Sequence, residues 1–287
     1  MTRILVFTPT YDGLLTSETV ESVEALAFDG ASSWVVRDEN QYPGRDVRNC
    51  VGQFAQGREM ALAGDYDGLL LVEHDMIVPV DGLQRLWDSP ADVVYGCYVF
   101  RHGMRVINLL QHTGTANIGQ SLSLYPKELA AAAKRGWVEV SGAGFGCLLI
   151  RRTVLERVAF RSVDGAAPDL PFAADCVGLG IRQIGRTDVR CGHVDSESGQ
   201  TLWPFEGSDG MSVQVTALQT VNISDDGQAV RLVQGQGYSL GGQVASELAR
   251  AGYVVIEVAD GYETATVPQA ETAAVKPVKR TRKKAGA

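Results

Sequence analysis

Residues 69–75 read Leu-Leu-Leu-Val-Glu-His-Asp, an apolar run that ends in two acids flanking a histidine. The run predicts a buried strand over 68–73, because consecutive apolar residues suit a strand that is covered on both faces. A first apolar strand is predicted over 3–8, and it continues into Thr-Pro-Thr-Tyr-Asp at 8–12. The carboxyl ends of parallel strands open onto one crevice, where a carboxylate can hold a divalent cation beside a phosphate. The two strand ends therefore predict a ligand site at one edge of a sheet.

Strand-like and helix-like segments alternate over the first two hundred residues. This order predicts an α/β fold with a mostly parallel central sheet and helices on both faces. The stretch 95–125 is less regular, and it predicts an extended β-ribbon or a loop that faces a substrate. The predicted strands are 3–8, 33–37, 68–73, 92–99, 137–140 and 145–151, and the predicted helices are 16–28, 46–63, 81–88, 126–135, 152–158 and 173–184.

The composition changes near residues 204–210, where we place a domain boundary. We predict a main domain over 1–206 and a small α+β accessory domain over 207–260, with a helix over 239–251. Residues 261–287 lack hydrophobic periodicity and are predicted to form a disordered tail. The net charge of the chain is −8, yet the tail is basic. The tail is a candidate contact for nucleic acid, and its alternative is a docking or solubility tail.

Several classes of protein are disfavoured by the composition. No apolar run approaches the roughly 20 residues that span a bilayer, and the N-terminus lacks the features of a secretory signal, so we expect a cytoplasmic protein. The five cysteines show no CxxC spacing, which predicts reduced thiols packed as small apolar groups. Cys191 and His193 are a poor basis for a zinc site, because no second close pair accompanies them.

The acids of the apolar run are the first candidate site residues. Glu73 and Asp75 are spaced so that both carboxylates can approach one hard cation and leave coordination positions for a diphosphate. Asp75 is the stronger ligand candidate, and Glu73 has the alternative of facing the ribose of a nucleotide. The competing interpretation is a solvated corner at the end of a strand.

Two further segments carry candidate binding residues. Arg48 and Asn49 lie near the start of a predicted helix, where a guanidinium and an amide suit a pyrophosphate or a base edge. The alternative is a surface helix with Arg–Asp pairs. The glycine-rich segment 141–152 includes Gly144 and Phe145, and its glycines permit close approach of the backbone to a ligand such as a sugar. The alternative interpretation, a tight turn that precedes a buried strand, is equally favoured.

Asp175 and His193 complete the candidates. Asp175 is predicted to open a helix, so it either caps the helix or acts as a general base. His193 follows a short strand-like segment, and a lone histidine is usually structural. Beside an acidic metal site, its imidazole is a candidate ligand.

Taken together, these residues resemble nucleotide-sugar-dependent glycosyltransferases of the GT-A fold, near the family 2 type and its phage-encoded relatives. The resemblance covers about residues 2–205. It rests on the order of a Thr-Pro-Thr-Tyr-Asp strand end, an Arg-Asn helix, a DxD-like strand end, a Gly-x-Gly-Phe-Gly segment, an acid near a helix start and a late histidine. It implies donor-binding roles for Thr8, Pro9, Thr10, Asp12, Arg48, Asn49, Glu73, Gly144 and Phe145, Mn²⁺ or Mg²⁺ ligands at Asp75, Glu73 and His193, and Asp175 as the catalytic base of an inverting transfer.

The resemblance thus predicts an enzyme that moves a sugar from a UDP- or GDP-type donor to a hydroxyl acceptor. The predicted acceptors are a hydroxymethylated DNA base, a virion protein or a cell-surface glycan. Two alternatives stay open. One is a virion protein that binds a sugar or nucleotide without catalysis, and the other is a nucleotidyltransferase, which would release pyrophosphate.

Overall fold

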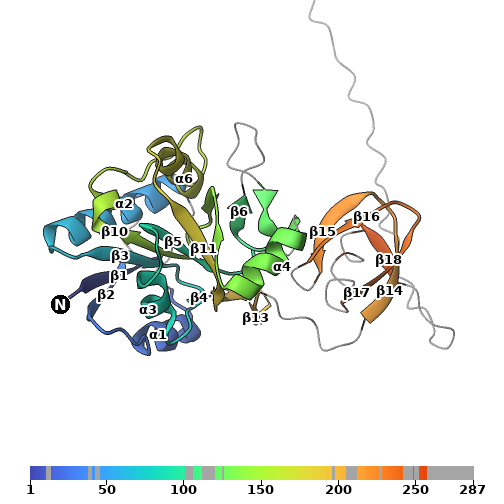
Figure 1. The fold of residues 1–287 in the computed structure, drawn as a ribbon, viewed down its shortest axis with the longest axis horizontal. Helices are drawn as coiled ribbons and strands as arrows, with labels where there is room; N and C mark the ends of the chain where they lie inside the picture. Colours follow the sequence, from blue (N-terminus) through green and yellow to red (C-terminus); the bar gives the residue numbers. More distant parts are fainter. Residues whose placement is uncertain are drawn as a thin grey trace, which may run out of the picture.

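Figure 1 shows an α/β body followed by a β-rich C-terminal unit in the computed structural model of the chain. The predicted basic tail and the candidate residue Asp12 lie outside the part of the chain that the structure describes. The described residues are 1–10, 14–37, 41–42, 46–100, 106–111, 120–124, 126–195, 198–204, 212–225, 228–241, 248 and 252–256.

The largest sheet among the described residues has seven strands in the order β2-β1-β3-β10-β5-β11-β8. β1 pairs in parallel with both β2 and β3, and β5 pairs in parallel with β11. β10 runs antiparallel between β3 and β5, and β8 runs antiparallel beside β11. The predicted mostly parallel α/β sheet is therefore confirmed. Its strands are β1 (Arg3–Pro9), β2 (Ala31–Arg37), β3 (Gly68–Val72), β5 (Val93–Cys97), β8 (Val138–Glu139), β10 (Cys147–Arg151) and β11 (Gln183–Arg190).

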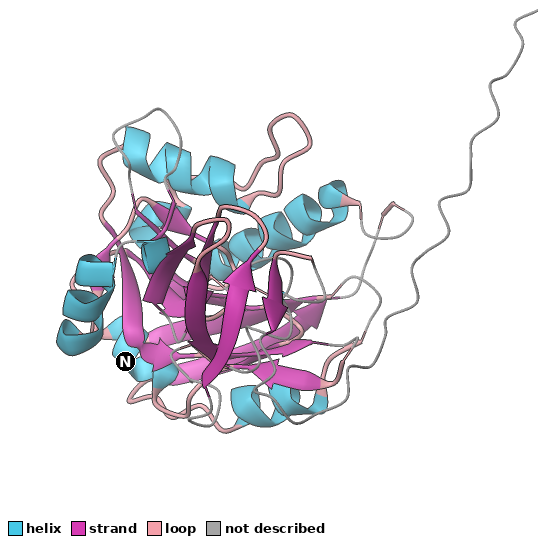
Figure 2. Ribbon diagram, turned by 90° about the vertical axis from the view of Figure 1, so that its right-hand side faces the viewer, coloured by secondary structure: helices cyan, strands magenta, loops and turns pink. Residues whose placement is uncertain are grey.

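Helices cover both faces of this sheet, as Figure 2 shows. Leu69 and Leu71 of β3 belong to one hydrophobic core with residues of α2, α4, α5 and α6, whereas Leu70 and Val72 belong to a second core with residues of α1 and α3. Because successive side chains of a strand point to opposite faces, the continuous apolar run of β3 is buried on both sides. The helices are α1 (Ser17–Glu24), α2 (Val47–Ala63), α3 (Gly82–Trp87), α4 (Pro126–Arg135), α5 (Arg152–Leu155) and α6 (Asp169–Gly178). None of the described helices is long and apolar enough to cross a membrane.

The last predicted helix of the main domain is displaced. The expected range was 173–184, but α6 begins at Asp169, and β11 already begins at Gln183. Pro171 does not block this earlier start, since the first turn of a helix needs no N–H donor. Gly180, with φ of 68°, follows the helix in the left-handed conformation and helps to end it.

The irregular stretch after β5 contributes a small antiparallel sheet. β6 (Leu109–Gln111) pairs with β7 (Gln120–Ser121) and with β9 (Gly142–Ala143). The predicted β-ribbon is therefore present in the described part of this stretch. Residues 101–105 and 112–119 lie outside it.

The C-terminal unit has a hydrophobic core of its own, which includes Val215, Ile223, Leu232 and Leu240. The predicted helix over 239–251 starts too early, because Ser239 pairs with β14 within strand β17. Most of the remaining helix prediction and both predicted domain boundaries fall on residues outside the described ranges. The strands are β14 (Ser212–Ala217), β15 (Val221–Asp225), β16 (Gln228–Leu232), β17 (Gly237–Gly241) and β18 (Val254–Ile256).

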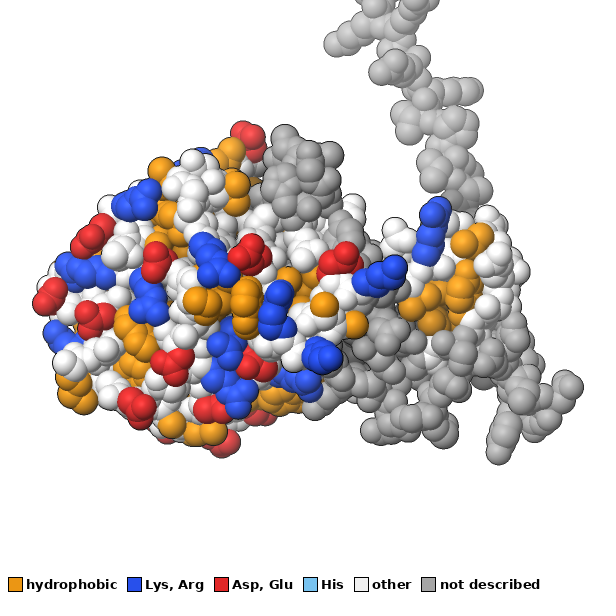
Figure 3. Space-filling model, in the orientation of Figure 1, with side chains coloured by type: hydrophobic (Ala, Val, Ile, Leu, Met, Phe, Trp, Pro, Cys, Tyr) orange, Lys and Arg blue, Asp and Glu red, His pale blue; other side chains and the backbone are white. Residues whose placement is uncertain are grey.

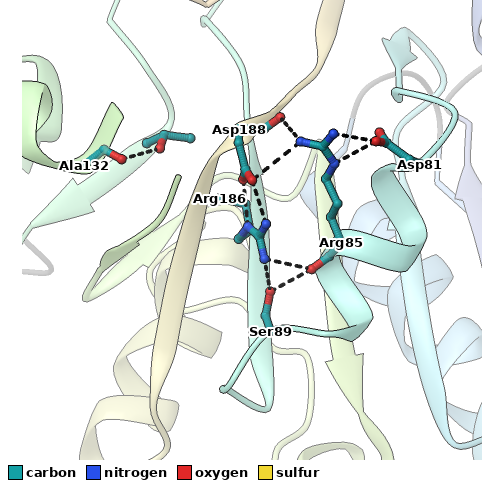
Figure 4. Close-up of polar contacts among 7 residues, drawn as sticks. Asp81, Arg85, Ser89, Ala132, Arg186 and Asp188 are labelled. Carbon is teal, nitrogen blue, oxygen red and sulfur yellow. Dashed lines mark hydrogen bonds and ion pairs between the residues drawn. The ribbon is translucent and has the colours of Figure 1, made fainter. Parts of the chain in front are cut away.

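Basic and acidic side chains are interspersed on the face of the α/β body that Figure 3 shows. One group of them, drawn in Figure 4, joins α3 to β11. The Arg186 guanidinium donates to both carboxylate oxygens of Asp188, at 2.7 and 2.6 Å, and to the Ser89 hydroxyl at 2.9 Å. Arg85 lies between Asp188 and Asp81, and its Nε donates to Asp81 at 2.7 Å. The network holds the helix against the neighbouring strand.

We expect this network to make stability depend on pH. Burial opposes ionisation of Asp188, but hydrogen bonds from Arg186 outweigh it and lower the pKa of this carboxyl. The stabilisation is complete above the ordinary aspartate pKa of about 3.9 and is lost as the pH falls through the lowered value. Asp188→Asn should cost about 1 kcal/mol at pH 7 and flatten the decline of Tm towards pH 3. Thermal melts at both pH values measure this, and Asp92→Asn, which alters an exposed ion pair, is the matched control.

Candidate functional site

The carboxyl ends of β1 and β3 lie side by side. The two strands are in register from Ile4 opposite Gly68 to Phe7 opposite Leu71, so the residues after Phe7 continue beside the acidic end of β3. The segment that leads into α1 also contacts this end. The backbone N–H of Thr16 and the hydroxyl of Thr19 both donate to the His74 carbonyl, at 3.0 and 3.1 Å. The predicted convergence of the two strand ends is therefore confirmed.

Asp75 lies in the interior of this edge, with 1% of its side chain exposed. Its Oδ1 is 3.7 Å from Nε2 of His193, and its Oδ2 is 3.6 Å from Nε2 of His74. Strand pairing explains the meeting with His193. β4 (Met76–Ile77) pairs with β12 (Gly192–Asp195), which in turn pairs with β13 (Gln200–Leu202), and Val194 donates to the Asp75 carbonyl at 2.8 Å.

The second ring nitrogen of His193 fixes the direction of its imidazole. Nδ1 lies 2.7 Å from the carbonyl oxygen of Val99. Because a carbonyl only accepts, Nδ1 carries the hydrogen, and Nε2 is directed at Asp75. Metal-binding histidines commonly donate their other N–H to a backbone carbonyl in this manner. The 3.7 Å between Nε2 and the carboxylate is longer than a hydrogen bond, and it is shorter than twice a coordination distance of about 2.1 Å. The separation of Asp75 Oδ1 and His193 Nε2 thus fits two ligands of one divalent ion.

Glu73 lies half-buried at the same strand end, where its backbone N–H donates to the Gly146 carbonyl at 3.0 Å. In the part of the chain that the structure describes, no three His, Cys, Asp or Glu side chains form a complete ligand set. An ion held here would therefore take further ligands from water or from phosphate oxygens, as Mg²⁺ and related ions often do. The ligand roles of Asp75, Glu73 and His193 stay predictions.

The end of β1 is buried and rigidly held. The hydroxyl of Thr8 accepts a hydrogen bond from Nε1 of Trp34 at 3.0 Å. The side-chain amide of Gln53 bonds both the N–H and the carbonyl of Thr10, at 2.9 and 2.7 Å. Pro9 lies between them and is also buried. These contacts give a fixed platform beside the acids, and the donor-binding roles of Thr8, Pro9 and Thr10 stay predictions.

Arg48 and Asn49 organise the chain that enters α2. Asn49 is buried, and its amide bonds both the N–H and the carbonyl of Tyr42, at 2.9 and 2.7 Å. The Arg48 guanidinium lies 3.7 Å from the centre of the Tyr42 ring and pairs with Asp46, whose pKa it lowers to about 2. The Arg–Asp pair that the sequence offered as the structural alternative is thus present. A donor-binding role for either residue stays a prediction.

The glycine-rich segment is packed rather than open. A Cβ atom at Gly144 would lie 2.2 Å from the Tyr98 hydroxyl oxygen. The packed Tyr98 side chain therefore explains why a glycine stands at this position. Phe145 is 3% exposed and contacts the rings of Phe54, Phe160 and Phe172. The tight-turn interpretation explains both residues, and their predicted contact with a sugar stays a prediction.

Asp175 does not open a helix, and that prediction is wrong. It lies late in α6, and its two carboxylate oxygens accept from Arg161 at 2.8 and 2.7 Å. Hydrogen bonding to Arg161 lowers the pKa of Asp175, so the carboxylate is a weaker proton acceptor than an ordinary aspartate. This environment does not favour the role of catalytic base.

Asp169 is the acid that actually begins α6, and sequence reasoning missed it. Burial raises the pKa of Asp169, which improves the carboxylate as a proton acceptor. Burial raises the pKa of Tyr98, and the negative charges of Glu73, Asp169 and Asp75 raise it further. The available signal was the Pro168-Asp169 pair, since proline and an acid are typical of a first helical turn.

The sequence matches no family model and no curated protein. Several solved structures are similar in fold. A197 from STIV has a TM-score of 0.47 at 17% identity, with 70% of this chain and 94% of that chain covered. S. aureus TarS in complex with UDP has a TM-score of 0.40 at 14% identity, with 66% and 58% covered. A glycosyltransferase involved in the glycosylation of the major capsid of PBCV-1 has a TM-score of 0.31 at 8% identity, with 53% and 61% covered.

The chain spans less than two thirds of the length of the TarS and PBCV-1 structures. At such low sequence identity, the similarity bears on the fold and not on the activity. The strand pairing and the site define the class of the protein. It is an α/β protein with a cluster of acids and histidines at the carboxyl edge of a mostly parallel sheet.

Proposed function

We propose that this chain is a metal-dependent glycosyltransferase that moves a sugar from a nucleoside-diphosphate donor to a hydroxyl group. One observation carries the proposal. A buried carboxylate at the end of β3, Asp75, faces Nε2 of a histidine whose other nitrogen is held by a carbonyl. Open α/β sheets bind their ligands at this edge, outside the carboxyl ends of the strands.

In the proposed reaction Asp75 and His193 would hold the ion, with Glu73 beside them. When bound, the ion would supply positive charge to stabilise the leaving diphosphate. An imidazole in the ligand set favours Mn²⁺ over Mg²⁺, which prefers oxygen ligands. The rigid end of β1, with Thr8, Pro9 and Thr10, supports the nucleotide.

The acceptor hydroxyl loses its proton to a carboxylate, and we assign this role to Asp169. Its half-buried position in the first turn of α6 and its raised pKa support the assignment over Asp175, which Arg161 neutralises. A single base that activates the acceptor is the arrangement of an inverting displacement, in which the acceptor oxygen replaces the diphosphate directly.

The test is incubation of the full chain with UDP- and GDP-sugars in the presence of Mn²⁺, Mg²⁺ or EDTA. At about a hundred times Kd, UDP with Mn²⁺ should stabilise the protein by about 2.7 kcal/mol and raise Tm by about 5–10 °C. Donor turnover should release UDP or GDP only with the metal, faster when hydroxymethylated DNA, a protein or a glycan supplies the acceptor. Release of pyrophosphate instead would identify a nucleotidyltransferase. Binding of UDP-sugar without nucleotide release would favour a binding protein.

A further inference from the structure

Tyr98 directly follows β5 and is buried at the centre of the candidate site, with 3% of the residue exposed. Its hydroxyl oxygen accepts from the backbone N–H of Gly146 at 3.2 Å. Its ring meets the His193 imidazole edge to face, with 5.3 Å between ring centres and 87° between ring planes. One side chain therefore contacts both the glycine-rich turn and the histidine that faces Asp75.

The turn is shaped around this side chain. A Cβ atom at Gly146 would lie 2.8 Å from two carbons of the Tyr98 ring, and one at Gly144 would lie 2.2 Å from the hydroxyl oxygen. The Gly146 carbonyl in turn accepts from the N–H of Glu73. A chain of hydrogen bonds thus runs from the Tyr98 hydroxyl, through Gly146, to the first acid of the Glu-His-Asp segment.

Tyr98 is itself held in place. The buried side chain of Asn108 accepts from the Tyr98 N–H at 2.9 Å and donates to the Gly96 carbonyl at 3.0 Å, and the Asn108 N–H donates to the Tyr98 carbonyl. The next carbonyl along the chain, that of Val99, accepts from Nδ1 of His193. Residues 98 and 99 therefore restrain the imidazole twice, once through the ring contact and once through the hydrogen bond.

We propose that Tyr98 is a positioning residue that holds the His193 imidazole and the Glu73 backbone in place for the metal and its diphosphate. The role rests on the proposed metal-dependent function. Residues that orient a metal ligand in this way typically contribute about 10–100-fold in metal affinity.

Tyr95, which lies in β5 three residues before Tyr98, provides a matched control. It is also a buried tyrosine, and its hydroxyl donates to Oε1 of Gln183 at 2.7 Å, but its ring belongs to the other hydrophobic core. Both Tyr95→Phe and Tyr98→Phe remove a buried hydrogen bond of a tyrosine hydroxyl. Tyr95→Phe does so in the other hydrophobic core, away from His193. A difference between the two variants therefore reports position rather than general stability.

The experiment measures Mn²⁺ affinity by calorimetry in the presence of UDP, together with the side-chain nitrogen signals of His193 by NMR without metal. We expect about 10-fold weaker Mn²⁺ binding for Tyr98→Phe, about 100-fold weaker binding for Tyr98→Leu, and a change below 2-fold for Tyr95→Phe. The Nδ1–H signal of His193 should shift in Tyr98→Leu and stay in place in Tyr95→Phe.

The outcomes separate this inference from the proposed function. Wild-type Mn²⁺ affinity in Tyr98→Phe, with an unchanged His193 signal, would overturn the positioning role while the transferase proposal stands. Equal losses in Tyr98→Phe and Tyr95→Phe would also overturn it, because they would indicate a stability effect. Wild-type protein that binds no Mn²⁺ with UDP would overturn the proposed function, and with it this role. If Tyr98→Leu does not fold, the comparison of the two phenylalanine variants decides.

Discussion

Asp75→Ala should reduce Mn²⁺-dependent release of UDP from a UDP-sugar by about 10³-fold and leave the fold intact. Removing one preorganised electrostatic group from an active site costs on the order of 10²–10³-fold in rate, and Asp75 is proposed to hold the ion itself. The side chain is 1% exposed, so its removal also relieves the cost of a buried charge. Circular dichroism and thermal melts should therefore resemble those of the wild type.

Two comparisons sharpen this experiment. Asp75→Asn keeps the shape of the side chain and removes its charge, so it should lose activity nearly as completely as the alanine variant. Asp92→Ala alters an exposed acid that pairs with Arg151 and should keep full activity. Turnover at the wild-type rate in Asp75→Ala, with the same dependence on Mn²⁺, would eliminate the assignment of the metal site.

Asp169→Asn should lower kcat by about 10²–10⁴-fold and change Mn²⁺ affinity little, because an amide cannot accept the acceptor proton. Since burial raises the pKa of Asp169, the acid limb of the wild-type rate profile should lie above the ordinary aspartate pKa of about 3.9. Activity falls as the pH drops through that raised value, where the carboxylate becomes protonated. Rate measurements between pH 4 and pH 8 test both expectations.

Asp175→Asn is the matched control, since it lies on the same helix and also replaces a carboxylate. It breaks the pair with Arg161 and should change kcat by less than about 3-fold. The opposite result, in which Asp175→Asn is inactive and Asp169→Asn is active, would restore Asp175 as the base and exclude Asp169.

The sequence predicted most of the α/β body because its signals are local. The apolar run of β3, the helical periodicity of α2 and the strand at 3–8 are each visible within one segment, and the structure confirms them within a few residues. The start of α6 was predicted at residue 173, four residues too late, although the first turn of a helix tolerates Pro171. As a result Asp175, predicted to open the helix, lies late in it, and Asp169 lies in its first turn.

By itself, the sequence determined that an apolar strand delivers acids to the edge of a parallel sheet, since alternating strands and helices allow few other arrangements. Only the tertiary structure decided which distant side chains meet those acids. His193 reaches Asp75 through the pairing of β4 with β12, and Tyr98 fills the space left by two glycines. The physical reason is that such contacts depend on strand order and side-chain packing between remote segments, which leave no local pattern in the chain.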